Sequence, residues 1–302
     1  MNGTALPPVF LNPRGGSAAK VRDALAGDRR VVLHETDPSA LKDEVGAAIG
    51  SDAPRVIISG GDGSIASAAS VLIDAAEKQG TRAELGVLPG GTFNHFAKEH
   101  GIPEDPAEAL AIAIGDNTAE VDAARVNGHV FLNTSSVGAY VRFVDIRERL
   151  EPRVGYWIAS FIAAIRTLAW QRTFDVELEV DGEVRHYRSA LVFIGVGERE
   201  TKLPTLGKRV ESGKRGLHVI VVQGAVRGRL LLLGLAAVAR GLGAVDRTPH
   251  LDSFMVERCT IDMPRKAGRV SQDGELVMME APLRYEILRG ALTVAVPKGY
   301  LA

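Results

Sequence analysis

The sequence contains a single cysteine, Cys259, among its 302 residues. One thiol cannot form an intramolecular disulfide, so a disulfide-stabilised fold is excluded. The residues next to Cys259 do not provide the Cys/His spacing of a metal site. We therefore expect Cys259 to be a buried structural side chain.

An excess of charge of one sign is also missing. The chain has 36 Lys and Arg residues against 37 Asp and Glu residues, which gives a formal net charge of −1. Nucleic-acid-binding proteins usually carry a strongly basic surface, so nucleic acid is not an expected partner. A local basic patch that faces a membrane stays open, because net charge says nothing about its distribution.

Long hydrophobic runs are lacking as well. The two most apolar stretches, residues 154–165 and 230–239, are shorter than the roughly 20 residues that a bilayer-spanning helix needs. Residues 1–8 lack the basic-then-apolar pattern of a secretory signal. The expected location is the cytoplasm, and peripheral contact with the inner face of the membrane is left open.

What the chain does contain is the composition and length of a two-domain globular protein. Hydrophobic residues make up 46% of the chain and charged residues 24%, which is typical of globular domains. A chain of 302 residues is long enough for two domains of ordinary size.

The first third alternates between strand and helix patterns. Strands are expected at residues 9–13, 30–34, 55–59 and 85–89, and helices at 17–25, 37–49, 65–77 and 94–99. This alternation predicts a layered, largely parallel α/β domain over residues 1–122.

The pattern changes near residue 123. Asn127-Gly128 is a strong turn signal for a hairpin. Short strands are expected at 174–181, 191–196, 217–222, 259–263, 283–286 and 292–296, and a long helix at 154–169. Many short strands predict an antiparallel β-sandwich over residues 123–302.

The segment Gly60-Gly61-Asp62-Gly63-Ser64 lies between an expected buried strand and an expected helix. Glycines there allow close approach of a ligand and leave N–H groups for phosphate at the helix start. A carboxylate in such a loop suits a residue that holds Mg²⁺ or accepts a proton from an attacking hydroxyl. The simpler alternative is a tight turn in which Asp62 caps the helix.

A second glycine turn, Leu88-Pro89-Gly90-Gly91-Thr92-Phe93-Asn94, also follows an expected strand. Two such turns at the carboxyl ends of strands favour one shared crevice. Neither turn has the Gly-Lys-Ser/Thr ending of a phosphate loop or the G-x-G-x-x-G pattern of a dinucleotide fold, which makes both classes poor candidates.

Five segments together resemble the diacylglycerol kinase catalytic-domain family. They appear in the order of that family and span nearly the whole chain: Asn12 to Gly16, Gly60 to Ser64, Leu88 to Ala97, the junction residues Val121, Asp122, Phe131 to Asn133 and Gly138, and Asp273 to Glu275. The Gly-Gly-Asp-Gly loop alone is shared with NAD kinases, whereas the combined set is specific.

The resemblance implies an α/β nucleotide-binding domain and a β-sandwich, with residues 291–302 returning to the first domain. It implies ATP and Mg²⁺ as cofactors, Asp62, Asp273 and Glu275 as catalytic residues, and Asp62 and Glu275 as metal ligands. Which of Asp62 and Asp273 is the general base stays open. The nucleotide-binding residues it implies are Asn12, Gly60, Gly61, Gly63, Ser64, Gly90, Gly91, Thr92 and Asn94.

This sequence departs from the family pattern in three places. Ser64 replaces a threonine and His95 replaces an aspartate. Residues 213–218 replace an Asp-Gly-Leu-Leu-Asp segment implicated in a structural Mg²⁺ site in the family, and they carry Lys214, Arg215 and His218 instead. That metal site is expected to be missing. The surrounding basic residues, 202–215, form either a solvated loop or a contact for anionic lipid headgroups.

The expected activity is ATP-dependent transfer of the γ-phosphoryl group to a lipid hydroxyl, such as that of diacylglycerol, at a membrane surface. Two alternatives stay open: an NAD kinase-like nucleoside kinase, and a non-catalytic lipid or nucleotide sensor. A homodimer is a further open expectation.

Overall fold

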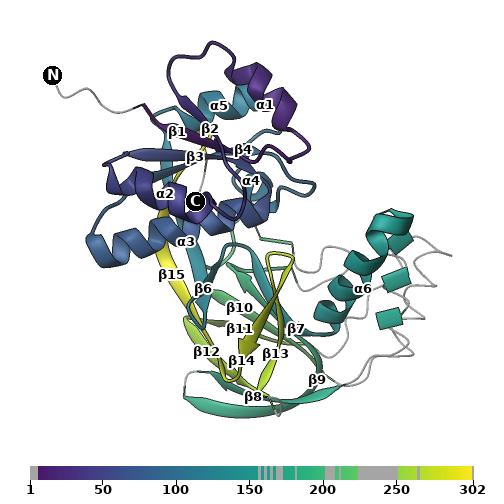
Figure 1. Ribbon diagram of the computed structural model, residues 1–302. Helices are drawn as coiled ribbons and strands as arrows, with labels where there is room; N and C mark the ends of the chain where they lie inside the picture. The colour runs from purple at the N-terminus through teal and green to yellow at the C-terminus, as the bar shows by residue number, and fades with distance from the viewer. Residues whose placement is uncertain are drawn as a thin grey trace. The chain divides into compact units, whose positions relative to one another are not determined.

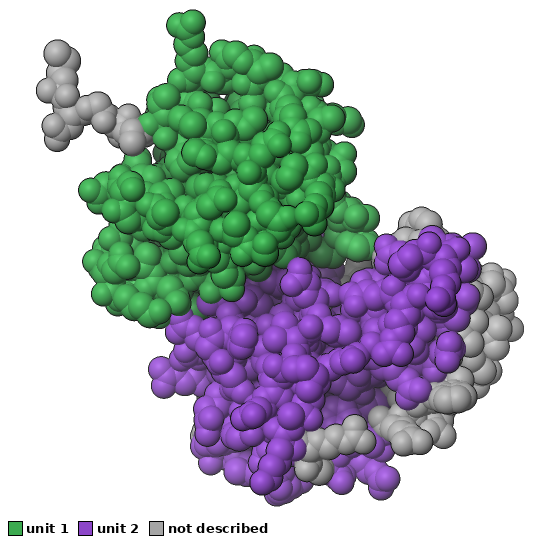
Figure 2. Space-filling model, viewed as in Figure 1, with its two compact units in different colours: residues 1–123, 288–302 green, residues 124–287 purple. Residues whose placement is uncertain are grey.

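The computed structural model describes residues 6–155, 158–159, 162–163, 166–167, 173–180, 182–200, 208–210, 212–223, 251–263 and 266–300. The chain divides into two compact units (Figure 2). Unit 1 contains Met1–Ala123 and Leu288–Ala302, and unit 2 contains Ala124–Ile287.

Unit 1 is built on a parallel sheet (Figure 1). Its strands are β1 (Pro8–Leu11), β2 (Val32–Glu35), β3 (Arg55–Gly60) and β4 (Glu84–Pro89), in the order β4-β3-β1-β2. The end of a long strand, β15 (Leu283–Ala295), lies parallel to β4, with Val294 opposite Leu85. β3 and β4 are buried almost throughout, as expected for strands covered on both faces.

Five helices connect and cover these strands: α1 (Ala18–Leu25), α2 (Leu41–Gly50), α3 (Asp62–Gln79), α4 (His95–Glu99) and α5 (Pro106–Ala113). In Figure 1, α1 and α5 lie on one side of the strands, and α2 and α3 lie on the other. The α/β class predicted from the sequence is therefore confirmed.

The helix predictions for unit 1 need one correction and one addition. The helix expected from residue 37 begins at Leu41, because the Asp37 side chain accepts a hydrogen bond from the Ser39 N–H and closes a turn there instead. Helix α5 was not predicted, although Asp105 before Pro106 is a start signal. The Asp105 carboxylate accepts hydrogen bonds from the first free N–H groups of α5.

Unit 2 is an antiparallel, strand-rich β-sandwich. Its strands are β5 (Thr118–Val126), β6 (His129–Phe131), β7 (Thr134–Gly138), β8 (Phe174–Val180), β9 (Glu183–Val196), β10 (Leu217–Gln223), β11 (Leu251–Val256), β12 (Arg258–Asp262), β13 (Ala267–Gln272) and β14 (Glu275–Glu280). The neighbouring strands β14-β13-β7-β9-β8-β12-β15 follow one another, β10 pairs with β9 and β11, and β5 forms a hairpin with β6. Helix α6 (Ala139–Val154) follows β7.

The core of unit 2 follows from alternation along its strands. In β8, Val176, Leu178 and Val180 are buried while the residues between them are exposed. The inward residues of the other strands join them around the buried side chains of Phe131 and Tyr285. The alternation therefore gives unit 2 one core between its strands.

The remaining secondary-structure predictions for unit 2 had mixed outcomes. The hairpin at Asn127-Gly128 is confirmed. The strands expected at 283–286 and 292–296 are one continuous strand, β15, because it pairs with β12 at one end and with β4 at the other. Half of the residues in the helix expected at 154–169 are described, and residues 158–159, 162–163 and 166–167 among them are helical. The apolar stretch at 230–239 lies outside the described residues.

No helix in the described part of the chain is both long enough and apolar enough to cross a bilayer.

The single thiol leads to a direct prediction. Cys259 lies on β12 with 3% of its surface exposed, and burial raises its pKa to about 12. We expect no modification by a thiol reagent such as DTNB at pH 8 in the native protein, and one equivalent after unfolding in guanidinium chloride. Rapid labelling of the folded protein at Cys259 would contradict this placement.

Candidate functional site

Three glycine-containing turns lie at one edge of the parallel sheet in unit 1. Residues 12–16, 60–64 and 90–94 directly follow β1, β3 and β4. These strands are neighbours and run in the same direction, so their carboxyl ends meet at the same edge. This is the edge at which open α/β sheets bind ligands.

The second and third turns touch through their backbones. The Gly90 N–H donates a hydrogen bond of 2.8 Å to the Gly60 carbonyl. A Cβ atom on Gly91 would lie 2.6 Å from the Cα atom of Gly61, closer than non-bonded carbon atoms approach. Glycine is therefore required for the approach itself, and the two turns form one backbone surface.

This contact predicts the effect of adding one methyl group. Gly91→Ala should push the two turns apart and weaken binding of the ATP expected from the sequence at least about tenfold, because a backbone atom cannot move aside as a flexible side chain can. Gly50→Ala is the matched control, since a Cβ at Gly50, the last residue of α2, meets no atom within 4 Å. Isothermal titration with Mg·ATP measures both variants, and equal affinities for the two would refute the role of the backbone contact.

The first turn is organised by Asn12. Its side-chain Oδ1 accepts a hydrogen bond of 3.0 Å from the Arg14 N–H, and its backbone carbonyl accepts one of 3.0 Å from the Gly15 N–H. The Asn12 N–H in turn donates to the Ser59 carbonyl at 3.1 Å. These bonds join the turn to the end of β3.

Asp62 connects α3 to α4. It is the first residue of α3, and its carboxylate accepts hydrogen bonds from the His95 and Phe96 N–H groups, at 3.1 and 3.0 Å. These are the first N–H groups of α4, so Asp62 caps the neighbouring helix rather than its own. Each carboxylate oxygen keeps further acceptor capacity.

Asn94, which precedes α4, is 5% exposed and has a left-handed backbone with a φ of 51°. Its side-chain Oδ1 accepts a hydrogen bond of 2.8 Å from the Gly91 N–H. Asn94 and Asp62 thus hold the third turn from both sides. A left-handed backbone at this position suits asparagine better than most residues.

The other residues predicted for this region differ in exposure. Gly63 and Ser64 lie in the first turn of α3, and a Cβ on Gly60 would lie 2.8 Å from the Ser64 Oγ. Thr92 is exposed. His95, the departure from the family pattern, is exposed and stacks on Phe93 with ring centroids 5.5 Å apart.

The sequence did not reveal how the end of the chain holds α4. His100, at the carboxyl end of α4, is 2% exposed, and its Nδ1 lies 2.6 Å from the Tyr300 hydroxyl. Tyr300 belongs to the C-terminal segment of unit 1. A histidine and a tyrosine that lie 200 positions apart carry no local signal for such a contact.

Asp273 lies in unit 2, in the turn between β13 and β14. Its backbone is left-handed, with a φ of 46°. Its carboxylate accepts hydrogen bonds from three consecutive N–H groups, those of Leu132 at 2.7 Å, Asn133 at 2.8 Å and Thr134 at 2.9 Å. The Asp273 side chain is therefore held in one orientation. Glu275, two residues later, is exposed at the start of β14.

The structure brings together the residues predicted around the three turns. Asp273 and Glu275 belong to the other unit.

Residues 213–218 do not fit a structural Mg²⁺ site. Mg²⁺ prefers oxygen ligands, whereas His218 provides nitrogen and both of its ring nitrogens have partners. Its Nδ1 accepts from the Arg199 N–H at 2.8 Å, and its Nε2 lies 2.6 Å from the Ser253 Oγ. Burial lowers the pKa of His218, which agrees with a neutral ring. Of the basic segment 202–215, residues 202–207 and 211 lie outside the described residues, whereas Lys208, Arg209, Lys214 and Arg215 are described.

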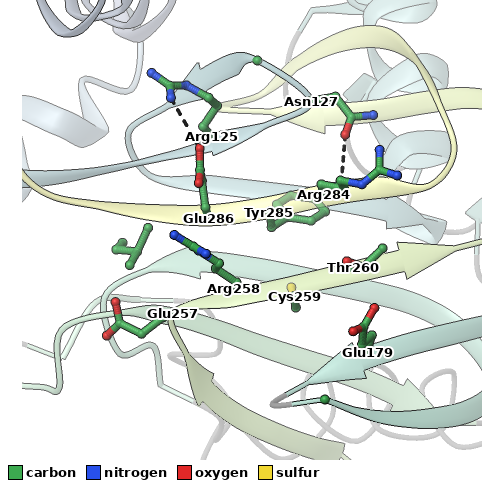
Figure 3. Close-up of a pocket in the computed structure, with 13 residues that line it drawn as sticks. Arg125, Asn127, Glu179, Glu257, Arg258, Cys259, Thr260, Arg284, Tyr285 and Glu286 are labelled. Carbon is green, nitrogen blue, oxygen red and sulfur yellow. Dashed lines mark hydrogen bonds and ion pairs between the residues drawn. The ribbon is translucent and has the colours of Figure 1, made fainter. Parts of the chain in front are cut away.

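A cavity of about 1020 Å³ opens elsewhere in unit 2 (Figure 3). None of the site residues predicted from the sequence lines it. Arg125 lies 3.4 Å from Glu286 across the cavity wall. The charged residues that line the cavity are Arg125, Arg258, Arg284, Glu179, Glu257 and Glu286. Equal numbers of opposite charges give no preference for an anion or a cation.

Comparison with known proteins matches the chain to one family. The model of the diacylglycerol kinase catalytic domain matches residues 8–126. A relative described as "Probable lipid kinase YegS", from Salmonella paratyphi A, is 35% identical over 304 residues, which cover 96% of this chain and 95% of the relative. A "Probable lipid kinase YegS-like" protein from Klebsiella pneumoniae is 31% identical over 201 residues, which cover 63% of this chain. That match spans 64% of the length of the Klebsiella relative.

Solved structures show the same fold. The crystal structure of a diacylglycerol kinase from Bacillus anthracis superimposes with a TM-score of 0.67 at 19% sequence identity, and the match covers 100% of both chains. At this identity the likeness establishes the architecture of the chain and nothing about its ligands.

Proposed function

The chain belongs to the diacylglycerol kinase catalytic-domain family, and from this we propose that it transfers the γ-phosphoryl group of ATP to a lipid hydroxyl. The observation that carries the proposal is the meeting of three glycine turns around Asp62 at the carboxyl edge of the parallel sheet. Backbone N–H groups and a carboxylate at one edge suit a nucleotide triphosphate with its metal ion.

In this proposal the three turns hold the nucleotide. The backbone of Gly60, Gly61, Gly90 and Gly91 lies in direct contact and leaves no side chain between ligand and main chain. The other proposed contacts come from the same turns: Asn12, Gly63, Ser64, Thr92 and Asn94. Backbone amides fixed in this way stabilise phosphate charge without reorganising during the reaction.

Asp62 fits the requirements of a Mg²⁺ ligand. Mg²⁺ in kinases is commonly held by one or two carboxylates together with substrate phosphates and water. The two N–H groups of α4 fix the Asp62 carboxylate and leave acceptor capacity on both oxygens. When bound, Mg²⁺ neutralises charge on the transferred phosphoryl group.

Asp273 is the proposed general base. Three N–H groups hold its carboxylate in one orientation, as proton abstraction from an acceptor hydroxyl requires. Glu275 is the proposed second acidic residue, either as a metal ligand or as an orienting group. Asp62 is the alternative base.

Radiolabelled ATP tests the proposal. The full chain is incubated with Mg²⁺, γ-labelled ATP and mixed micelles that each contain one candidate lipid, with diacylglycerol first. We expect label in the lipid fraction with at least one acceptor, and none with the Asp62→Asn variant. NAD serves as a parallel acceptor. Label in NAD alone would indicate a nucleoside kinase, and the absence of any transfer would remove the catalytic proposal.

A further inference from the structure

Arg199 is a buried cation close to the end of β9. It is 3% exposed, although arginine is almost never fully buried unless it has partners. Removing a charged group from water costs several kcal/mol before its new contacts are counted. The contacts of Arg199 therefore indicate what the residue does.

The guanidinium group binds backbone carbonyls. Its Nη2 donates hydrogen bonds to the Val196 carbonyl at 2.7 Å and to the Asn133 carbonyl at 3.0 Å. The Asn133 carbonyl also accepts from the Val196 N–H at 2.9 Å. Arg199 thus attaches the segment before β7 to the end of β9.

The peptide group whose carbonyl accepts a hydrogen bond from Arg199 also donates a hydrogen bond to Asp273. The Asn133 carbonyl and the Thr134 N–H are the two ends of one peptide bond. The Thr134 N–H donates to the Asp273 Oδ1 at 2.9 Å. A guanidinium at the carbonyl end and a carboxylate at the N–H end both favour the dipole of this peptide, and such chains of hydrogen bonds strengthen one another.

A glycine makes room for the arginine. Gly195 is opposite Thr134 in one direction and opposite His218 in the other, so the three residues form a row across β7, β9 and β10. A Cβ on Gly195 would lie 2.5 Å from the Arg199 Cγ. The arginine side chain therefore lies directly over Gly195.

His218 fixes the other end of the arginine. Its Nδ1 accepts from the Arg199 N–H, and its Nε2 lies beside the Ser253 Oγ. His218 thus holds the backbone of Arg199, and the Asn133 carbonyl holds its side chain.

We propose that Arg199 is a positioning residue that fixes the Asp273 carboxylate through the peptide between Asn133 and Thr134. This role rests on the proposed function in which Asp273 acts on the acceptor hydroxyl. In this neighbourhood a side-chain cation organises the backbone.

The kinetic test uses Arg199→Lys, because a lysine ammonium keeps the charge and cannot reproduce the planar fork of the guanidinium. We expect kcat to fall about 10–100-fold, as for other residues that orient a catalytic group, while the KM for ATP changes little. Gly195→Ala should reproduce the loss without altering any charge. Gly268→Ala on β13 is the matched control, because a Cβ there meets no atom within 4 Å.

A double-mutant cycle separates positioning from general stability. Once Asp273 is replaced by asparagine, Arg199→Lys should lower kcat by less than about twofold, because the group it positions has gone. Losses that multiply in full in the double variant would overturn the proposal.

Hydrogen exchange tests the same contacts without catalysis. Arg199→Lys should accelerate exchange at the amides of Leu132, Asn133 and Thr134, while amides in unit 1 keep their wild-type rates. Unchanged exchange at these three positions would overturn the positioning role. Accelerated exchange in a protein that phosphorylates no acceptor would retain the contact and reject the proposed activity instead.

Discussion

Asp62→Asn is expected to lower the rate of phosphoryl transfer by at least about a hundredfold, the loss typical when one electrostatic contact to a transition state is removed. The asparagine keeps the shape of the side chain and removes its charge. It should also abolish any gain in ATP affinity from Mg²⁺, because the metal would lose its proposed carboxylate ligand. Titrations of ATP with and without Mg²⁺, together with single-turnover rates, measure both effects.

The capping role of Asp62 adds a structural cost to this variant. An asparagine offers one acceptor oxygen, so its amide nitrogen would face the N–H of His95 or Phe96. Leaving one such N–H without an acceptor costs roughly 1–3 kcal/mol. Asp105→Asn is the matched control: both amides that Asp105 caps bond to a single oxygen, which asparagine retains. If Asp62→Asn lowers the melting temperature yet keeps its rate and its Mg²⁺ dependence, Asp62 is only a helix cap.

Asp273→Asn is expected to lower turnover by about 10²–10⁴-fold, the range typical of a lost general base. Asparagine tolerates the left-handed backbone at this turn, so it removes proton acceptance with little strain. ATP affinity should stay close to the wild-type value, because the proposed nucleotide residues belong to unit 1. Single-turnover rates at saturating ATP measure the chemical step.

Asp273→Ala should have the same kinetic effect and a larger structural one. It leaves the N–H groups of Leu132, Asn133 and Thr134 without the carboxylate. Asn127→Ala is the matched control, since Asn127 is also a left-handed turn residue whose side chain binds backbone groups. It should lower stability and spare the rate. A variant of Asp273 that loses ATP binding but turns over normally at saturating ATP would show that the roles of Asp62 and Asp273 are reversed.

Local patterns predicted the parts of the fold that depend on local chemistry. The apolar run before Gly60 indicates a buried strand, and Asn127-Gly128 requires a tight turn wherever it lies. The glycine turns could be located for the same reason, because glycine after a strand signals close backbone approach. Which turns touch one another depends on the order of the strands in the sheet. That order arises from pairing between distant segments, so no single segment predicts it.

The contacts that hold the site could not be predicted, because they join distant residues. The sequence predicted that Asp62 lies beside the phosphates of a nucleotide. Its hydrogen bonds to the first N–H groups of α4 depend on how two turns pack, which the sequence does not show. Arg199 lies between two glutamates in the sequence and looks like any surface charge. Only the neighbouring strands reveal that it is buried over Gly195.

The parallel sheet of unit 1 takes its final strand from the end of the chain. Val294 of β15 pairs beside β4, and the Asn117 side chain donates hydrogen bonds to the carbonyls of Val296 and Pro297. A ribosome releases these residues only after all of unit 2 has been synthesised. During translation the β4 edge of the sheet in unit 1 therefore stays unpaired until unit 2 has been synthesised. A nonsense codon close to residue 288 would therefore remove the strand that pairs with β4, and so damage the unit whose first segment is made earliest.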